Sequence, residues 1–137
     1  MKMFFTYKSK GSIDTSDKLE KINNFLEKKG ELLSKDLRLK NFKPSGEKMN
    51  DKDILDRSLN LIKECDVFIA DVSFPSLGVG YQINFAKNLN KKIICLYEVQ
   101  VKQELSPIIN RDNYIHLIKY KDLEEMFIQL ELYFKRL

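Results

Sequence analysis

The chain has 137 residues, 43% of them hydrophobic, and a formal net charge of +4 at pH 7. This length and composition fit one folded domain, residues 1–137, and exclude a disordered chain. No apolar run approaches the length that spans a bilayer, and residues 1–5 are too short for a signal peptide. We therefore expect a cytoplasmic protein without a membrane partner.

The positive charge is scattered along the chain. Between residues 18 and 29 lysines are mixed with glutamates, which is typical of a solvated helix face. The sequence has no basic tract and no basic–aromatic alternation, so we expect no nucleic-acid partner. Cys65 and Cys95 lie in or beside apolar segments without CxxC spacing, which predicts buried free thiols in a reducing compartment. No metal-ligand cluster occurs in the sequence, and we expect neither a metal nor a cofactor.

The first half of the chain predicts two strands and two helices. Apolar spacing and capping residues place them at 2–6 (strand), 16–29 (helix capped by Thr15 or Ser16), 31–34 (weak strand) and 51–64 (helix capped by Asn50 or Asp51). The second helix is expected to bury one face. That face holds Ile54, Leu55, Ser58, Leu59 and Ile62.

The second half continues the alternation. Its predicted elements are 66–72 (central strand), 79–89 (helix), 92–97 (strand), 105–110 (short helical turn), 114–118 (strand) and a last amphipathic helix with Met126, Phe127, Leu130 and Phe134. Strands that alternate with helices predict an α/β fold, a doubly wound five-stranded parallel sheet. The expected order is 2-1-3-4-5, as in flavodoxin-like and Rossmann-like folds. A ligand crevice is then expected at the carboxyl ends of strands 1 and 3.

A loop rich in turn residues follows the central strand. The apolar run 67–70 stops at Asp71, and Pro75, Ser76, Gly78 and Gly80 come before the next helix. A strand that opens through glycines onto a helix N-terminus is suited to an anion, because free N–H groups and the helix dipole point at one place. The same pattern places Gln82 at the mouth of the sheet.

The segment from Asp66 to Ala86 resembles the nucleoside 2-deoxyribosyltransferase superfamily. The closest pattern is that of the 2′-deoxynucleoside 5′-phosphate N-hydrolases, whose motif reads Pro-Ser-x-Gly-Val-Gly-Tyr-Glu. Residues 75–81, Pro-Ser-Leu-Gly-Val-Gly-Tyr, match seven positions in a row. The resemblance extends more weakly over the whole chain, through the strand at 92–97 and the turn at 105–109.

The resemblance implies cleavage or exchange of the N-glycosidic bond of a deoxynucleoside or deoxynucleotide. In that family a glutamate ends the motif and attacks the anomeric carbon, and an aspartate on the preceding helix assists, as in retaining glycosidases. Serines at the positions of Ser76 and Ser106 hold the 5′-phosphate of a small-molecule nucleotide. The second serine comes from a neighbouring subunit, so the resemblance also implies a homodimer with Ser106 contributed across the interface.

Both catalytic carboxylates are replaced in this chain. Gln82 occupies the nucleophile position, and Ser58 occupies the acid position 24 residues earlier. Ser76 and Ser106 are kept, so the binding half of the site is present while the chemical half is altered. The hypothesis is a nucleoside 5′-monophosphate-binding protein whose N-glycosidic cleavage is lost or reduced.

Three alternatives stay open. An active N-glycosidase or deoxyribosyltransferase would use a relocated carboxylate, with Asp71 the first candidate and Asp56, Glu98 and Glu104 the others. A receiver-like signalling domain would phosphorylate Asp71, although the acidic pair that holds magnesium in such domains is missing after the first strand. A structural module that only binds a partner is the third.

Each binding residue also has a purely structural interpretation. Ser76 suits a turn, and Ser106 before a proline suits a helix cap. Gly78 and Gly80 suit tight turn geometry, which we expect whatever the ligand. Tyr81 suits core packing as well as stacking on a base.

Overall fold

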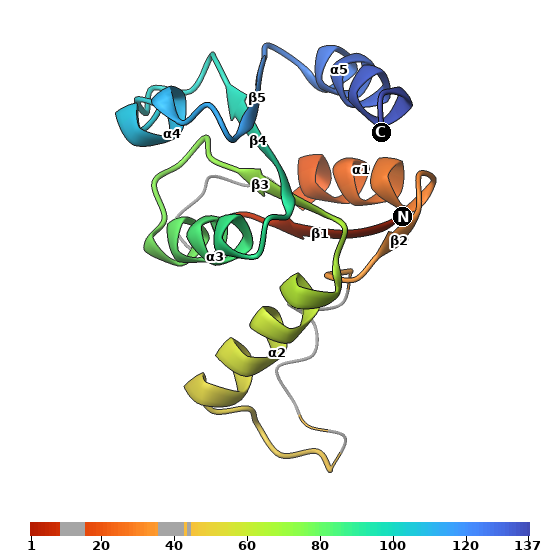
Figure 1. Ribbon diagram of the computed structural model, residues 1–137, viewed down its shortest axis with the longest axis vertical. Helices are drawn as coiled ribbons and strands as arrows, with labels where there is room; N and C mark the ends of the chain where they lie inside the picture. The colour runs from red at the N-terminus through yellow and green to blue at the C-terminus, as the bar shows by residue number, and fades with distance from the viewer. Residues whose placement is uncertain (9–15, 36–42, 44) are drawn as a thin grey trace.

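The computed structural model describes residues 1–8, 16–35, 43 and 45–137 (Figure 1). The helix cap predicted at Thr15 or Ser16 depends on side chains outside this part. The described elements alternate along the chain. They are β1 (Lys2–Thr6), α1 (Ser16–Glu27), β2 (Glu31–Leu32), α2 (Asp51–Glu64), β3 (Val67–Asp71), α3 (Leu77–Asn88), β4 (Lys92–Glu98), α4 (Pro107–Arg111), β5 (His116–Tyr120) and α5 (Leu123–Lys135).

The five strands form one sheet in the order β2-β1-β3-β4-β5, and every neighbouring pair is parallel. The α/β fold and the strand order expected from the sequence are therefore confirmed. In the register, Thr6 lies opposite Ala70, and Glu98 lies opposite Tyr120. The last residues of these strands thus share the carboxyl edge of the sheet, where parallel α/β proteins bind ligands.

Helices cover both faces of the sheet, and each face has its own core (Figure 1). Successive side chains of a strand point to opposite faces, so odd-numbered residues of β1 and β3 pack against α1 and α5. Even-numbered residues of the same strands pack against α2 and α3. The first core includes Phe5, Ile69, Ile22, Leu26, Met126 and Leu130. The second includes Phe4, Phe68, Ile62, Val79, Ile83 and Ala86.

The buried face predicted for α2 is only partly present. Ile62 is buried, but Ile54 and Leu55 are 37% and 42% exposed. Figure 1 shows the reason, because the amino-terminal turns of α2 extend beyond the sheet and only the carboxyl-terminal turns lie close to it. These apolar residues do lie on a helix at the predicted spacing, but those in its amino-terminal half, Ile54 and Leu55, do not contact the core.

Two strand boundaries also differ from the expectation. β2 ends at Leu32, and β5 begins at His116, two residues later than predicted. At β5 the cause is a turn around Asp112, whose side-chain Oδ1 accepts from the N–H of Tyr114 and whose carbonyl accepts from the N–H of Ile115. β5 also ends two residues later than predicted, at Tyr120, which lies opposite Glu98 at the carboxyl edge of the sheet.

Both cysteines are buried and free, as the sequence predicts. Burial raises the pKa of Cys65 to about 11 and that of Cys95 to about 12, because a thiolate is poorly solvated away from water. Both thiols are therefore inert at neutral pH. Within the described ranges, no helix combines the length and the apolar character that a bilayer crossing requires.

Candidate functional site

Ser76 ends the loop after β3 and caps α3. Its backbone is extended, with φ −150° and ψ 123°, and its Oγ accepts a 3.3 Å hydrogen bond from the N–H of Val79. This bond satisfies one of the free donors at the helix start, so α3 begins at Leu77, two residues earlier than predicted. Gly78 and Gly80 consequently lie inside the helix.

The turn role expected for Gly78 and Gly80 is therefore wrong. Neither has a positive φ; among the described residues only Gly46 and Asn90 do. A Cβ added at Gly80 would meet nothing within 4 Å, and one at Gly78 would meet only Ser76 Oγ at 4.0 Å. Neither backbone conformation nor protein packing demands glycine at these two positions. Their small size leaves space on the helix surface instead, beside the two cavities described next.

The first cavity brings together the two positions that the resemblance marks as catalytic. Gln82 and Ser58 both line it, and its volume is about 490 Å³. Tyr81 lines it too and is 58% exposed, so core packing does not explain this residue. The remaining lining residues are Asp51, Ile54, Leu55, Leu77 and Gly78.

The polar side chains in this cavity are held by neighbours. Thr6 donates its hydroxyl hydrogen to Oε1 of Gln82 at 2.7 Å, which fixes Gln82 at the carboxyl end of β1. Ser58 donates to the backbone carbonyl of Leu55 at 2.9 Å. The cavity therefore offers an amide and a hydroxyl where a pair of carboxylates is expected for glycosidic chemistry. The motif at residues 75–82 could not have indicated Thr6, because Thr6 and Gln82 are 76 residues apart in sequence.

The second cavity lies on the other side of the first turn of α3. Ser76 and Ser106 both line it, with Gly80 and Glu104, and its volume is about 630 Å³. A single chain thus brings the two serines to one cavity. Ser106 precedes Pro107 at the start of α4, but its side chain makes no capping hydrogen bond. Its hydroxyl is not used to cap the helix, in contrast with that of Ser76.

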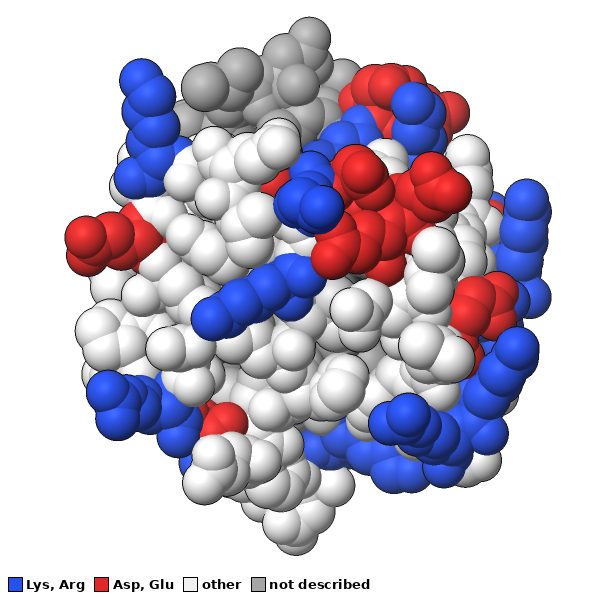
Figure 2. Space-filling model, turned by 90° about the horizontal axis from the view of Figure 1, so that it is seen from above, with Lys and Arg blue, Asp and Glu red and all other residues white. Residues whose placement is uncertain are grey.

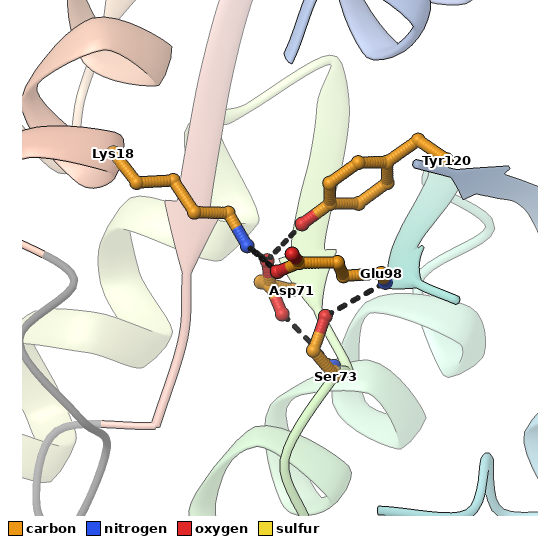
Figure 3. Close-up of polar contacts among 5 residues, drawn as sticks. All are labelled: Lys18, Asp71, Ser73, Glu98 and Tyr120. Atoms are coloured by element: carbon orange, nitrogen blue, oxygen red, sulfur yellow. Dashed lines mark hydrogen bonds and ion pairs between the residues drawn. The ribbon is translucent and has the colours of Figure 1, made fainter. Parts of the chain in front are cut away.

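Asp71 faces away from both cavities. It continues the side of β3 that carries Ile69, the side covered by α1 and α5, whereas Gln82 lies on the α2 and α3 side. Figure 3 shows its surroundings. Lys18 Nζ lies 3.7 Å from Asp71 Oδ2, and the Tyr120 hydroxyl donates to the same oxygen at 3.2 Å. The carboxylate is only 7% exposed and is engaged on both oxygens, since Oδ1 accepts from the N–H of Ser73 at 2.9 Å.

Glu98 joins the same group, which we call the Lys18 cluster: Lys18, Asp71, Ser73, Glu98 and Tyr120 (Figure 3). Glu98 Oε2 lies 2.9 Å from Lys18 Nζ, and the N–H of Glu98 donates to Ser73 Oγ at 3.0 Å. The nearby carboxylate of Asp71, with hydrogen bonds to Tyr120 and Glu98, raises the pKa of Lys18 even though burial opposes this. Burial and the charge of Asp71 raise the pKa of Tyr120. The cluster is a satisfied ion-pair network that ties α1 to the ends of β3, β4 and β5.

The charges on one face of the molecule match the scattered pattern of the sequence. Figure 2 shows uncharged residues over much of the middle of that face, acidic side chains gathered beside basic ones in its upper part, and several basic side chains along its lower right edge. Both signs of charge are thus present on this face. Among the residues described, no group of three or more His, Cys, Asp or Glu side chains is placed to hold a metal ion.

Comparisons with known proteins bear on the site. No family model matches the sequence. The chain is 34% identical over 123 residues to a 5-hydroxymethyl-dUMP N-hydrolase of Esox lucius, which covers 86% of this chain and 85% of that protein. It is 32% identical over 127 residues to a protein of Syntrophotalea carbinolica that carries the name 2′-deoxynucleoside 5′-phosphate N-hydrolase 1, covering 93% and 89% of the two chains.

Solved structures agree with these relatives. A CMP N-glycosidase of Clostridium botulinum superposes with a TM-score of 0.66 at 26% identity, covering 96% of this chain and 99% of that chain. The solution structure of BlsM, at 19% identity and a TM-score of 0.71, shares the fold over 98% of this chain and 90% of that chain. The family expected from residues 75–81 is thereby confirmed. By its sequence and its fold, the chain belongs to the family of the 2′-deoxynucleoside 5′-phosphate N-hydrolases, in the nucleoside 2-deoxyribosyltransferase superfamily.

Proposed function

We propose that this protein binds a nucleoside 5′-monophosphate and that its N-glycosidic bond cleavage is lost or greatly reduced. The observation that carries the proposal is the amide of Gln82 at the first cavity, held by Thr6 at 2.7 Å, where the family motif has a glutamate. The ligand is a small molecule, and the site needs no metal or cofactor for the binding itself.

The chemical argument rests on charge. A retaining glycosidase attacks with a carboxylate and stabilises an oxocarbenium-like transition state with the same negative charge. Gln82 carries no charge, and its amide nitrogen is a poor nucleophile. Ser58, at the acid position, carries a hydroxyl that is far too weak an acid to protonate a leaving base near neutral pH, and this hydroxyl already donates to the carbonyl of Leu55. Losing such groups typically lowers a rate by several orders of magnitude.

The binding argument rests on the second cavity. Ser76 and Ser106 line it, and the amino end of α3 begins beside Ser76. Hydroxyl groups and free N–H groups at the start of a twelve-residue helix favour a phosphate. Glu104 lines the same cavity, and its charge would oppose a dianion close to it. We place the phosphate at Ser76 and the start of α3, away from Glu104.

One observation favours a second candidate, an active N-glycosidase or deoxyribosyltransferase that uses another carboxylate. Asp51, at the start of α2, lines the same cavity as Gln82. Asp71 and Glu98 are poor candidates by comparison, because Lys18 engages both on the opposite side of the sheet. The Asp51 carboxylate is the one that separates the two functions experimentally.

We propose further that the protein works in the cytoplasm as a homodimer. Leu77 is 96% exposed and Ile108 is 79% exposed, and both line the second cavity. A second copy seated on these side chains would remove them from water and bring its own Ser106 close to the site. Light scattering of the purified protein measures this directly, and Leu77→Asp should convert a dimer into a monomer.

Calorimetry and chromatography together test the main proposal. Titration with the eight common ribo- and deoxyribonucleoside 5′-monophosphates should give micromolar binding to at least one, and the matching nucleosides should bind more weakly. Overnight incubation with each nucleotide should release no free base. A flat calorimetric response to all eight would refute nucleotide binding. Base release that Asp51→Asn abolishes would establish the second candidate instead.

A further inference from the structure

The hydrogen bond between Thr6 and Gln82 has a direction. Thr6 Oγ donates, and Gln82 Oε1 accepts, at 2.7 Å. A threonine hydroxyl has one hydrogen to give, so this bond uses it on the amide oxygen. Thr6 is the last residue of β1 and lies on the side of the sheet that faces α2 and α3, next to the cavity that Gln82 lines.

The direction of this bond settles the orientation of the amide. With Oε1 held by Thr6, the Nε2 group with its two hydrogens occupies the other branch of the Gln82 side chain. Among the residues described, none accepts a hydrogen bond from Nε2. Gln82 lines the first cavity, and with Oε1 engaged by Thr6 the group that it can still offer to a ligand is the donor Nε2. The family motif has an attacking carboxylate at this position, which is an acceptor.

The stereochemistry of a nucleoside says what such a donor would meet. In a β-nucleoside the base lies on one face of the furanose, and a group placed to attack the anomeric carbon approaches from the other face. The 2′-hydroxyl of a ribonucleotide lies on that other face, one carbon away. An amide N–H placed there can donate a hydrogen bond to the oxygen of this hydroxyl, which a 2′-deoxynucleotide lacks.

From these steps we propose that Thr6 is a positioning residue, which turns the amide of Gln82 so that the site selects nucleotides bearing a 2′-hydroxyl over their 2′-deoxy counterparts. This inference rests on the proposed nucleotide binding and names its sugar. Removing a hydrogen bond to an uncharged partner in a protected site lowers affinity by about 5-fold. The ribonucleotide of each pair should therefore bind about 5-fold more tightly than the deoxyribonucleotide with the same base.

Three variants test the role of each group by calorimetry with AMP and dAMP, CMP and dCMP, GMP and dGMP, and UMP and dUMP. Thr6→Val removes the hydroxyl at almost the same volume and should bring the ribo-to-deoxy ratio close to 1. Thr6→Ser keeps the hydroxyl and should retain the ratio. Gln82→Met keeps the length of the side chain without the amide and should also abolish the preference. A purely structural role for Thr6 would weaken both members of a pair equally.

The possible failures are distinguishable. If nucleotides bind with equal affinity in each pair, or if the deoxy form is preferred, the sugar selection is wrong while nucleotide binding stands. If none of the eight binds, the proposed function itself is wrong, and the sugar selection falls with it. The orientation has a test that needs no ligand. In the ¹⁵N-correlated NMR spectrum of the natural protein, the side-chain amide signals of Gln82 are identified as those that disappear in Gln82→Met. These signals should shift in Thr6→Val and stay in place in Thr6→Ser. Unchanged signals in Thr6→Val would overturn the positioning role.

Discussion

Lys18 on α1 reaches across the end of the sheet to Asp71 on β3, with 3.7 Å between Lys18 Nζ and Asp71 Oδ2. The pair lies on the side of the sheet opposite Gln82, although Asp71 and Gln82 are close in sequence. Because the side chains of a strand alternate between faces, the residue at the end of β3 serves the α1 side. The loop that follows it serves the candidate site. Neighbouring parts of this segment thus contribute to opposite faces of the sheet: Asp71 to the ion pair with Lys18, and the loop after it to the candidate site.

Replacing Lys18 should destabilise the fold. Lys18→Ala would leave the buried carboxylate of Asp71 without its cation. Removing one partner of a largely buried pair costs about 3 kcal/mol. Urea unfolding measures the change. The control is Lys21→Ala on the same helix, since Lys21 pairs with Asp17 in an exposed i,i+4 ion pair worth about 0.5 kcal/mol or less. Equal losses in the two variants would show that the Lys18 cluster is not a stabilising network.

High pH should weaken the fold through the buried thiols. In the unfolded chain both thiols titrate near 9, whereas in the folded chain Cys65 and Cys95 titrate at about 11 and 12. A raised folded pKa means that the stability is full below pH 9 and is lost as pH rises toward the folded values. At pH 10 the loss is roughly 1 kcal/mol per thiol.

Urea unfolding at pH 7 and pH 10 measures this loss, and the double variant Cys65→Ala/Cys95→Ala isolates the thiols. Its stability at pH 7 will be lower because two side chains are truncated, but its loss between the two pH values should be smaller than that of the natural chain by about 2 kcal/mol. The raised pKa values of Lys18 and Tyr120 act in the same direction above pH 10, so some loss remains. An unchanged pH dependence in the double variant would contradict the assignment to the thiols.

The fold was readable from the sequence because its signals are local. The strand Val67–Asp71 contains a continuous apolar run over 67–70, and helices carry caps and apolar stripes at helical spacing. The regular alternation of strands and helices along the chain then leaves few topologies. Two boundaries differ from the prediction because a single side-chain hydrogen bond determines each of them. Ser76 determines the start of α3, and Asp112 determines the start of β5.

The site was readable only in part. Residues 75–82 carry the motif, so its position at the carboxyl edge follows from the order of the elements. The environment of Asp71 could not be predicted. In the sequence Lys18 has the pattern of a solvated helix face, and its contact with Asp71 depends on the packing of α1 beside β3. Ile54 and Leu55 misled the prediction in the opposite way, since an apolar stripe that lines a cavity has the same spacing as one that lines the core.

Gly80→Ala should make the protein more stable and a poorer binder. Alanine is favoured over glycine in a helix by about 1 kcal/mol, and the added Cβ meets no protein atom within 4 Å. Gly80 also lines the second cavity, so the added methyl group would take up space there and should weaken nucleotide binding. Thermal unfolding and nucleotide titration give the two readouts. Gly46→Ala is the contrasting control, because φ of +89° at Gly46 disfavours a side chain and should cost stability.

Ser76 and Ser106 should separate capping from ligand binding. Ser76→Ala removes the cap of α3 and should cost about 1 kcal/mol, as should Asp122→Ala, which removes the cap of α5. Of these two cap variants, Ser76→Ala should also weaken binding of a 5′-monophosphate, by about 10-fold, whereas Asp122→Ala should not. Ser106→Ala should weaken the same binding with little change in stability, because this side chain caps nothing. Nucleotide affinity that survives both serine changes would remove the phosphate from the second cavity.

Restoring the two carboxylates should restore chemistry. Ser58 and Gln82 line one cavity, and Ser58→Asp with Gln82→Glu would place an acid and a nucleophile in the positions that the family motif specifies. Their combined effect should exceed the product of the single changes, because a retaining mechanism needs both groups at once. Chromatography of the free base should show release at least about 100-fold faster from the double variant than from the natural chain. Gln82→Glu with Ser58→Asn is the matched control, since asparagine fills the same space without an acid. If the double variant binds nucleotides as the natural chain does and still releases no base, the replacement of these two residues does not account for the proposed loss of activity.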